Sequence, residues 1–548
     1  MKIKKYLALA LAALLTLSTL AGCGSGDTTP SNNPGTGESQ PGGQGDQMSA
    51  AGIQTANTET GNTQKTDETI VIQLGNYPDY FWHPGTDGSS GTNEEQIINA
   101  AFLDRLVDYD EAKNEVVPML AERWEIDGPN FTFYLRSGVK MTDGSDLVAD
   151  DVVYTVNLWK ANCASNDTGK YIEDVAKVDD STVTITFNSE APDIIRMLTW
   201  ANFGIVSEDE VNAVGGPAAA AQNPVIGSGK YRFKECKQGE YVILERNEDY
   251  WDSSYAGYFK TIRFTFVNDP NSMVSAVMSG DAQVAYDLPV AQASSFAENS
   301  SVRTYLYSNG EVEHLFFNHG EGHPTSDLKV RQAIAKALNY PAIAGIATAG
   351  FGGPALSYVQ TSATYYTPGW TAEELVPDIE GAKALLAEAG YGDGNPLKLT
   401  TVTLPDLMDV YTVIQANLRD AGIELEIQQV DMGGFVPAML FDKSYDIVAV
   451  GDSAIFRTPQ LPQFVSPGIV FGGPNIVLDN HIEILTRLMN AKDDAAAKSI
   501  LQEYNDQIKS DLMCVNLYEA LRSSIVGSDI KGFAIRERGY IDVTTLYK

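Results

Sequence analysis

Apolar and polar residues alternate in several short stretches of the chain after residue 66. The clearest stretches are residues 131–135, 182–187, 262–266 and 423–427. A period of two puts apolar side chains on one side of a strand and polar side chains on the other. We therefore predict half-buried strands at these four places, and we expect further strands at residues 71–74 and 312–317.

Helical periodicity separates these predicted strands. Asp327 and Asp378 stand where N-caps are expected, and Gly390 stands where a C-terminal glycine is expected after the second of these helices. Two more helices are predicted over residues 411–421 and 498–512. The alternation of helix, glycine and strand is typical of layered α/β proteins.

The N-terminal segment differs in pattern from the rest of the chain. Residues 1–22 combine a lysine-rich start with an apolar stretch of about 15 residues, which is shorter than the roughly 20 that cross a membrane. This pattern predicts a signal peptide. Residues 20–23, Leu-Ala-Gly-Cys, resemble the lipobox of bacterial lipoproteins, in which Cys23 becomes the acylated first residue. A plain signal peptide and an uncleaved anchor are the alternatives.

Residues 24–66 are predicted to be a flexible linker. The segment has no aromatic residue and is rich in Gly, Ser, Thr, Pro, Asn and Gln, so it buries too little apolar surface to fold. A coil of this length spans roughly 35 Å. With a lipid on Cys23, it is expected to tether the folded body near the outer face of the cytoplasmic membrane.

Composition narrows the possible functions. A chain of 548 residues implies two or three domains, and a formal net charge of −34 excludes nucleic-acid binding as a main activity. Apart from Cys23, the cysteines are Cys163, Cys236 and Cys514, with no C-x-x-C pair. Buried free thiols are expected, although a pairing of two of them stays open.

Catalytic and metal-binding motifs are missing from the sequence. It contains no P-loop, no H-E-x-x-H and no G-x-S-x-G. His314, His319 and His323 lie close together, but the first belongs to the strand predicted at residues 312–317 and the others to a glycine-rich turn. We therefore predict a protein without enzymatic activity, without a cofactor and without a metal site.

Several motifs resemble one family in the same order along the chain. They are residues 117–124 (VPMLAERW), 131–140 (FTFYLRSGVK), 143–145 (DGS), 149–155 (ADDVVYT), 226–231 (IGSGKY), 245–251 (ERNEDYW), 279–282 (SGDA), 316–318 (FFN), 330–334 (VRQAI) and 383–391 (KALLAEAGY). The pattern is similar to the family 5 extracellular solute-binding proteins of ABC importers, the oligopeptide- and dipeptide-binding group. The resemblance covers residues 69–535 approximately.

This resemblance implies a bilobal α/β fold of the periplasmic-binding-protein type (type II, cluster C-like) with an extra subdomain. Lobe I is expected to combine residues 67–110, 226–310 and 519–548, with the subdomain at 111–225 and lobe II at 311–518. The resemblance also implies a ligand cleft between the lobes, a monomer, and a membrane-embedded ABC permease as partner.

Candidate ligand-binding residues follow from the same resemblance. Asp452 matches the aspartate that pairs with a peptide α-amine, although the tryptophan of that motif is missing here. Arg457 is a candidate for holding a carboxylate. Aromatic candidates at strand and helix ends are Tyr80, Phe81, Trp82, Trp200, Phe203, Phe351, Tyr365 and Tyr366. The alternatives are a loop or cap role for Asp452, a surface position for Arg457 and core positions for the aromatics.

Three functions stay open at this point. The first is the capture of a peptide for an ABC importer. The second is the same transport role for another solute, such as an oligosaccharide or a metal chelate. The third is a surface sensor or a secreted hydrolase, although the lack of a nucleophile motif argues against hydrolysis.

Overall fold

The computed structural model describes most of the chain after the predicted linker. The described residues are 54, 56, 64–78, 80–82, 92–162, 169–222, 227–252, 254, 257–392, 394–443, 445–453, 457, 479–536 and 539–548. The predicted signal peptide, Cys23, Cys163 and most of the predicted linker lie outside them. Within the described part, no helix is long and apolar enough to cross a membrane.

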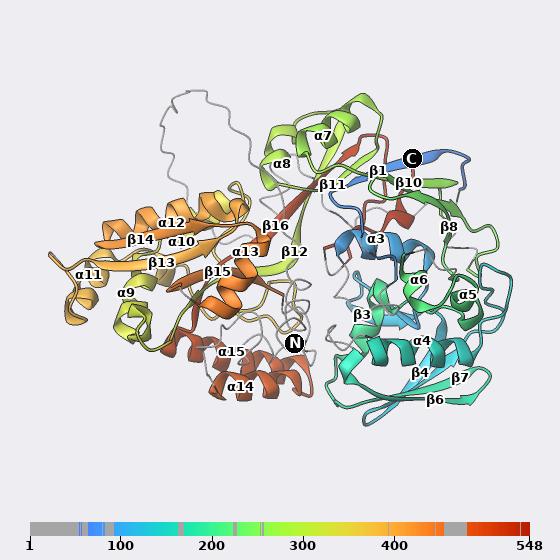
Figure 1. Ribbon diagram of the computed structural model, residues 1–548, viewed down its shortest axis with the longest axis horizontal. Coiled ribbons are helices and arrows are strands. Elements are labelled where there is room, and N and C mark those ends of the chain that lie inside the picture. Colours follow the sequence, from blue (N-terminus) through green and yellow to red (C-terminus); the bar gives the residue numbers. More distant parts are fainter. Residues whose placement is uncertain are drawn as a thin grey trace.

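A ten-stranded sheet runs through the molecule (Figure 1). Its strands, in spatial order, are β14 (Ile423–Gln429), β13 (Leu397–Thr403), β15 (Ile447–Asp452), β12 (Val302–Phe317), β16 (Cys514–Gly527), β11 (Val284–Leu288), β1 (Thr69–Leu74), β10 (Thr261–Phe266), β9 (Tyr241–Arg246) and β8 (Tyr231–Lys237). We call the part with β1 and β8–β11 lobe I and the part with β13–β15 lobe II. The long strands β12 and β16 belong to both and connect them.

The parallel strands of both lobes end at this connection. In lobe I, β1 is parallel to β10 and β11, and β11 is antiparallel to β16. In lobe II, β13 is parallel to β14 and β15, and β15 is antiparallel to β12. Since β12 is itself antiparallel to β16, the carboxyl ends from the two lobes point toward each other. Open α/β sheets bind ligands at the carboxyl ends of their strands.

A bulge interrupts the β12–β16 pair between the lobes. Ser308 pairs with Leu521 and Val312 pairs with Glu519, so three residues of β12 stand opposite a single residue of β16. The middle one, Gly310, has a φ of +81°, which a residue with a Cβ adopts only with strain. A bulge bends and twists a strand locally. The two lobes are therefore joined where the ladder is weakest.

A smaller antiparallel sheet forms a subdomain beside lobe I. It consists of β4 (Ala121–Asp127), β5 (Asn130–Leu135), β7 (Thr182–Phe187) and β6 (Ile172–Asp179), and a two-stranded sheet pairs β2 (Val107–Asp110) with β3 (Glu115–Pro118). Figure 1 shows α4 against this sheet. The strands predicted at residues 131–135, 182–187, 262–266 and 423–427 are confirmed as β5, β7, β10 and β14.

Helices cover the sheets on both sides. Those of lobe I and the subdomain are α3 (Asn93–Phe102), α4 (Ala149–Asn162), α5 (Glu208–Ala213), α6 (Pro217–Gln222), α7 (Pro270–Ser279) and α8 (Val290–Phe296). Those of lobe II are α9 (Leu328–Ala337), α10 (Tyr340–Ala347), α11 (Ile379–Glu388), α12 (Met408–Asp420), α13 (Met432–Pro437), α14 (Asp479–Met489) and α15 (Asp494–Asp511). The N-caps predicted for α9 and α11 are confirmed, since Asp327 accepts from the N–H of Lys329 and Asp378 from that of Gly381.

Helix α15 begins one turn earlier than the sequence predicts. The expected start was residue 498, whereas the helix starts at Asp494. Asp493 is its N-cap, because the side chain accepts a hydrogen bond from the N–H of Ala496. The run of alanines that follows this cap is helical although it adds little to the apolar periodicity.

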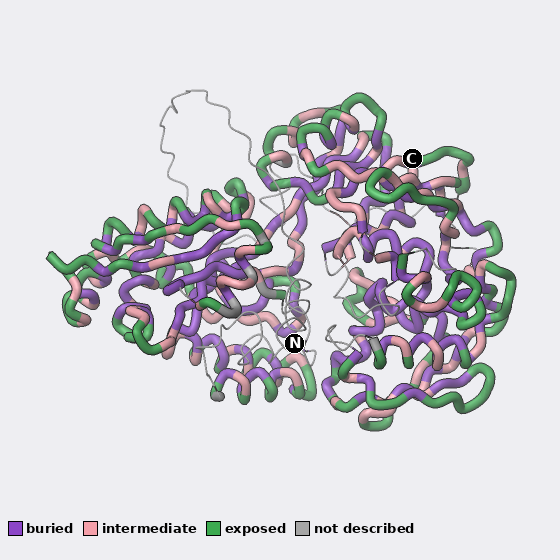
Figure 2. Tube along the Cα trace, in the orientation of Figure 1, coloured by how far each residue is buried: buried purple, intermediate pink, exposed green. Residues whose placement is uncertain are grey.

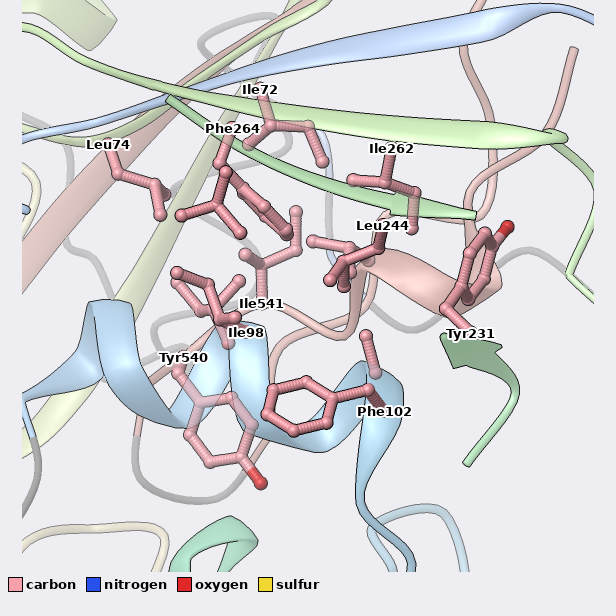
Figure 3. Close-up of a cluster of buried hydrophobic side chains, with 14 of the residues drawn as sticks. Ile72, Leu74, Ile98, Phe102, Tyr231, Leu244, Ile262, Phe264, Tyr540 and Ile541 are labelled. Carbon is pink, nitrogen blue, oxygen red and sulfur yellow. The ribbon is translucent and has the colours of Figure 1, made fainter. Parts of the chain in front are cut away.

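Each lobe has its own buried core (Figure 2). In lobe I, Ile72, Phe264 and Leu244 of the sheet pack against Ile98 and Phe102 of α3 (Figure 3). Lobe II has two cores, one on each face of its part of the sheet, and the subdomain has another. Most of the large apolar residues pack in these cores. The candidate site is therefore identified from its polar groups and from the ends of the strands.

The glycine and tryptophan motifs of the sequence meet around one buried carboxylate. Asp104 accepts hydrogen bonds from Trp251 Nε1 at 2.8 Å, from the Ser228 hydroxyl at 3.2 Å and from the Tyr250 hydroxyl at 3.3 Å. Burial raises the pKa of Asp104 to about 6, although these donors oppose the shift. The motifs at residues 226–231 and 245–251 thus meet at Asp104, which lies between α3 of lobe I and β2.

Candidate functional site

The candidate site is the region where the carboxyl ends of the strands from both lobes meet at the β12–β16 pair. From lobe II, β15 ends here at Asp452 and β13 is followed by Asp406. From lobe I, β11 ends with Asp287 and Leu288. The two connecting strands contribute Glu311, Glu313 and Arg522. The region is therefore rich in carboxylates and is built by five separate segments.

Asp452 is the last residue of β15. Its backbone pairs with Val312, and the preceding Gly451 pairs with Glu313. A residue that contacts a ligand is expected at this position, the carboxyl end of a strand. The side chain of Asp452 lies outside the described part of the structure.

Arg457 connects lobe II to the subdomain. Its backbone N–H donates to Asp193 Oδ2 at 3.0 Å, and its Nε donates to the same oxygen at 3.3 Å. Its Nη1 donates to the carbonyl oxygen of Ala491 at 2.8 Å, and its Nη2 lies 3.1 Å from Asp494 Oδ1. The arginine is buried, so in this conformation its donors are engaged by protein groups.

The tyrosines at residues 365 and 366 lie in one of the lobe II cores. Tyr365 is fully buried, and its ring centroid lies 5.9 Å from the Arg457 guanidinium carbon. Tyr366 is half-buried and packs against the same core. In this core Tyr358 stacks on His314 with 4.5 Å between ring centroids. The structure thus brings together Arg457 and Tyr365 among the predicted residues.

The other aromatic candidates are spread over three cores. Phe81 and Trp82 are buried in the lobe I core, and Trp200 and Phe203 are buried in the subdomain core. Phe351, which follows α10 of lobe II, packs against Leu306 and Leu521 beside the bulge. Tyr80 is half-buried, and its backbone N–H donates to Glu95 Oε1 at 3.4 Å.

The acidic residues around Arg522 were missed by the reasoning from sequence. Arg522 Nε lies 3.5 Å from Asp287 Oδ1, and both side chains are only partly exposed, at 27% and 33%. The charges of Asp287, Glu311 and Asp406 favour the protonated guanidinium and raise the pKa of Arg522 against the effect of burial. One arginine is thus surrounded by several carboxylates drawn from both lobes.

Glu313 is the most buried acid of this group. It is 5% exposed and lies in β12 between Val312 and His314, which are also buried. Burial, together with the charges of Glu311 and Asp406, raises the pKa of Glu313 to about 8. The sequence does mark Glu313 as unusual. It is the one acid in the strand predicted at residues 312–317, where the other residues are apolar or aromatic except for His314.

The described residues also bear on metal and thiol chemistry. Among the described residues, no three or more His, Cys, Asp or Glu side chains are arranged to hold a metal ion. His314 lies in β12, where its Nδ1 is 2.9 Å from Asn516 Oδ1. Cys236 and Cys514 are free thiols, so the expectation of buried thiols is confirmed for Cys514 and is wrong for Cys236, which is exposed on β8.

Sequence comparison finds one family model and several curated relatives. The family model "Bacterial extracellular solute-binding proteins, family 5 Middle" matches residues 115–467. The dipeptide-binding protein of Escherichia coli (strain K12) is 26% identical over 378 residues, which are 64% of this chain and 69% of that protein. The glutathione-binding protein GsiB of Salmonella paratyphi A is 28% identical over 349 residues, 62% of this chain and 65% of the relative. The chain therefore spans about two thirds of the length of these relatives.

Solved structures match a larger part of the chain. A dipeptide-binding protein from Pseudoalteromonas sp. SM9913 in complex with Met-Leu has a TM-score of 0.72 and 20% identity, covering 88% of this chain and 100% of that one. NikA from Brucella suis in complex with Fe(III)-EDTA has a TM-score of 0.77 and 19% identity, with the same coverage. At this identity the likeness establishes the fold, which is the predicted α/β periplasmic-binding-protein fold.

Proposed function

Because this chain belongs to family 5 of the bacterial extracellular solute-binding proteins, we propose that it captures a peptide between its two lobes and delivers it to an ABC importer. Proteins of this family bind solutes and are not enzymes. One observation carries the proposal: the carboxyl ends of the parallel strands from both lobes meet at the bulged β12–β16 pair. A ligand at this place contacts both lobes at once.

Lobe closure follows from this arrangement. A ligand that touches both lobes in the closed state gains contacts that the open state lacks, so it shifts the population toward the closed state. The bulge at Gly310 and the contact between Arg457 and Asp193 are two places where the described chain connects the moving bodies. A closed, loaded form is the species that an importer distinguishes from the empty form.

Asp452 is proposed to read the peptide α-ammonium. Its place at the end of β15, next to the pairing of Gly451 with Glu313, supports this role. A charge-assisted hydrogen bond in a partly dry site contributes roughly 1.5–3 kcal/mol. Arg457, Tyr80, Trp82, Trp200, Phe351, Tyr365 and Tyr366 are secondary candidates, and the buried ones among them are expected to act by shaping the site.

The test compares two peptides with two proteins. Calorimetry should show that Asp452→Asn weakens a peptide with a free α-amine by about tenfold, which corresponds to about 1.4 kcal/mol. An N-acetylated peptide should bind wild type poorly and should lose little in the variant. Asp420→Asn, an exposed change of the same kind at the end of α12, serves as the control and should change neither affinity.

Equal losses for the two peptides would mean that Asp452 supports its loop and does not read the amine. If wild type binds neither peptide, the peptide proposal fails. The same titration with an oligosaccharide or a metal chelate then tests the other transport role.

A lipid anchor is the second part of the proposal. The lipobox-like residues 20–23 support it, and Cys23 lies outside the described residues. Stable membrane attachment through this route depends on the acyl chains. In membrane fractions of the producing cell, Cys23→Ser should move the protein from the pellet to the medium or supernatant. A Ser variant that stays in the pellet after signal cleavage would disprove the anchor.

A further inference from the structure

Glu313 has a buried carboxylate oxygen that lacks a hydrogen-bond partner. The residue is 5% exposed, and its Oε1 accepts no hydrogen bond among the described residues. Leaving a buried polar atom unpaired is unfavourable, and such atoms are uncommon in folded proteins. This acceptor, at the point where the two lobes join, is open to a donor from a ligand.

The carboxylates of Glu313 and Glu311 both lie close to Gly451 of β15. A Cβ placed on Gly451 of β15 would meet Glu313 Oε2 at 3.2 Å and Glu311 Oε2 at 3.6 Å. Both carboxylates thus converge on the space that the missing side chain of Gly451 leaves open. Like charges at such a place repel each other unless a cation or a proton lies between them.

Arg522 is the arginine of the described residues that acts on this group of acids. Among the described residues, Arg522 is the cation whose charge lowers the pKa of Glu313, while Glu311 and Asp406 raise it. Arg522 is shared, since it also faces Asp287 at 3.5 Å. We call Glu311, Glu313, Asp406, Asp287 and Arg522 the hinge cluster. Its acids outnumber its base by four to one.

The hinge cluster is reachable from solvent on one side. Asp406 is exposed, Glu311 is half-exposed, and Arg522 is 27% exposed, whereas Glu313 lies at the buried end. Asp287 adopts a φ of +60°, an uncommon conformation for a residue with a side chain and one that is found at functional sites.

We propose that the hinge cluster binds a cationic side chain, the ammonium of lysine or the guanidinium of arginine, of the captured peptide. This deepens the proposed function and rests on it. An organic cation fits better than a metal ion, because no metal-holding arrangement exists among the described residues. The ammonium or guanidinium donates to Glu313 Oε1 and neutralises the excess of negative charge around it.

This subsite is separate from the one proposed for the α-ammonium. Glu313 pairs with Gly451, whereas Asp452 pairs with Val312, the next position along the ladder. A ligand that uses both positions therefore carries two cationic groups, which selects peptides with a basic residue over neutral peptides of the same length.

The experiment measures this preference with two matched peptides. Calorimetry at pH 7.5, where the α-amine of a peptide is still mostly protonated, compares glycyl-lysyl-glycine with glycyl-norleucyl-glycine, which has a similar side chain without the ammonium. Wild type should bind the lysine peptide at least about tenfold more tightly. Glu313→Gln should reduce this preference to within about threefold and should leave the norleucine peptide nearly unchanged. Asp420→Asn controls for the general negative charge of the protein and should keep the preference.

The other outcomes decide the proposal as well. Equal affinity of wild type for the two peptides, or an equal loss of both in Glu313→Gln, overturns the cation subsite while peptide binding itself stands. If Glu313→Gln fails to fold, Asp406→Asn at the exposed end of the cluster takes its place and should lower the preference by about threefold or more; an unchanged preference overturns the proposal.

A failure of the proposed function is distinguished by a separate probe. If neither peptide binds, wild type is titrated with cadaverine, a free diamine. Binding of cadaverine that Glu313→Gln or Asp406→Asn weakens supports the subsite, although the peptide function has failed. No binding of cadaverine overturns both.

Discussion

Arg457 and Asp193 join lobe II to the subdomain on the other side of the molecule, because the backbone N–H and the Nε of Arg457 both donate to Asp193 Oδ2, at 3.0 and 3.3 Å. Asp193 directly precedes Ile194 and Ile195 of the subdomain core, while Arg457 is bonded to the carbonyl of Ala491 in lobe II. The contact between Arg457 and Asp193 therefore forms only when lobe II and the subdomain approach each other.

The first prediction concerns this pair. Asp193→Asn removes the negative charge that faces the buried guanidinium, so the closed state loses a charge-assisted contact and the open state is unaffected. We expect peptide affinity to fall by about tenfold, or about 1.4 kcal/mol. Small-angle scattering should show a larger radius of gyration for the variant at the same peptide concentration.

The matched control for this prediction is Asp494→Asn. Asp494 also faces Arg457, at 3.1 Å from Nη2, but it lies in lobe II, on the same body as the arginine. It is about half-exposed, so its loss should change affinity by less than about threefold. If Asp193→Asn and Asp494→Asn lowered peptide affinity equally, the Arg457–Asp193 contact would not act between lobe II and the subdomain.

The second prediction concerns the bulge in β12. Gly310 has a φ of +81°, so Gly310→Ala introduces a Cβ into a left-handed conformation, which costs about 1–2 kcal/mol. Thermal unfolding should show lower stability, and the open–closed equilibrium should change because the strain lies in the connection between the lobes. Gly345→Ala in α10 is the control: it has open space around its Cβ position and should be neutral or stabilising by up to about 1 kcal/mol.

The sequence predicted local elements well because their causes are local. Strands such as β5 and β7 follow from alternation within six residues, and the N-caps of α9 and α11 follow from one aspartate each. Strand β12 was predicted only over residues 312–317, although it begins at Val302. Its first half is a strand because it pairs with β16, which lies about 200 residues further along the chain, and no pattern in the sequence reveals that pairing.

The site was harder to predict for a similar reason. The position of Asp452 at a strand end follows from a motif, but the partners of Arg457 come from Asp193, Ala491 and Asp494 and are set by tertiary folding. The burial of Trp82 depends on the lobe I core, whose residues come from distant parts of the chain. Only Glu313 left a trace in the sequence, as an acid inside an apolar strand.

The third prediction separates core aromatics from ligand contacts. Trp82 is fully buried in the lobe I core, so Trp82→Ala should lower the free energy of unfolding by about 3–5 kcal/mol. Tyr80 is half-buried, and Tyr80→Phe should change stability by less than about 0.5 kcal/mol. Thermal unfolding measures both. A Trp82→Ala protein that is as stable as wild type and has lost peptide binding would instead place Trp82 at the ligand.

The fourth prediction concerns pH and a buried acid of the subdomain. Glu210 in α5 is 3% exposed, and burial, helped by the charge of Asp143, raises the pKa of Glu210 to about 9. In the unfolded chain its pKa is the ordinary 4.5, so between pH 4.5 and 9 the folded protein holds a proton that the unfolded protein releases. The contribution of Glu210 to stability is therefore present below pH 4.5 and is lost as the pH rises toward 9.

Glu210→Gln removes this titration and keeps the shape of the side chain. Its unfolding free energy should be close to that of wild type near pH 5 and should exceed it at pH 9 by about 1 kcal/mol or more. Denaturant unfolding at pH 5, 7 and 9 measures the difference. Glu208→Gln, an exposed change two residues earlier in the same helix, should follow the wild-type profile throughout. Parallel pH profiles for wild type and Glu210→Gln would mean that Glu210 titrates in the folded protein as it does in water, and that the apolar surroundings of α5 are open to solvent.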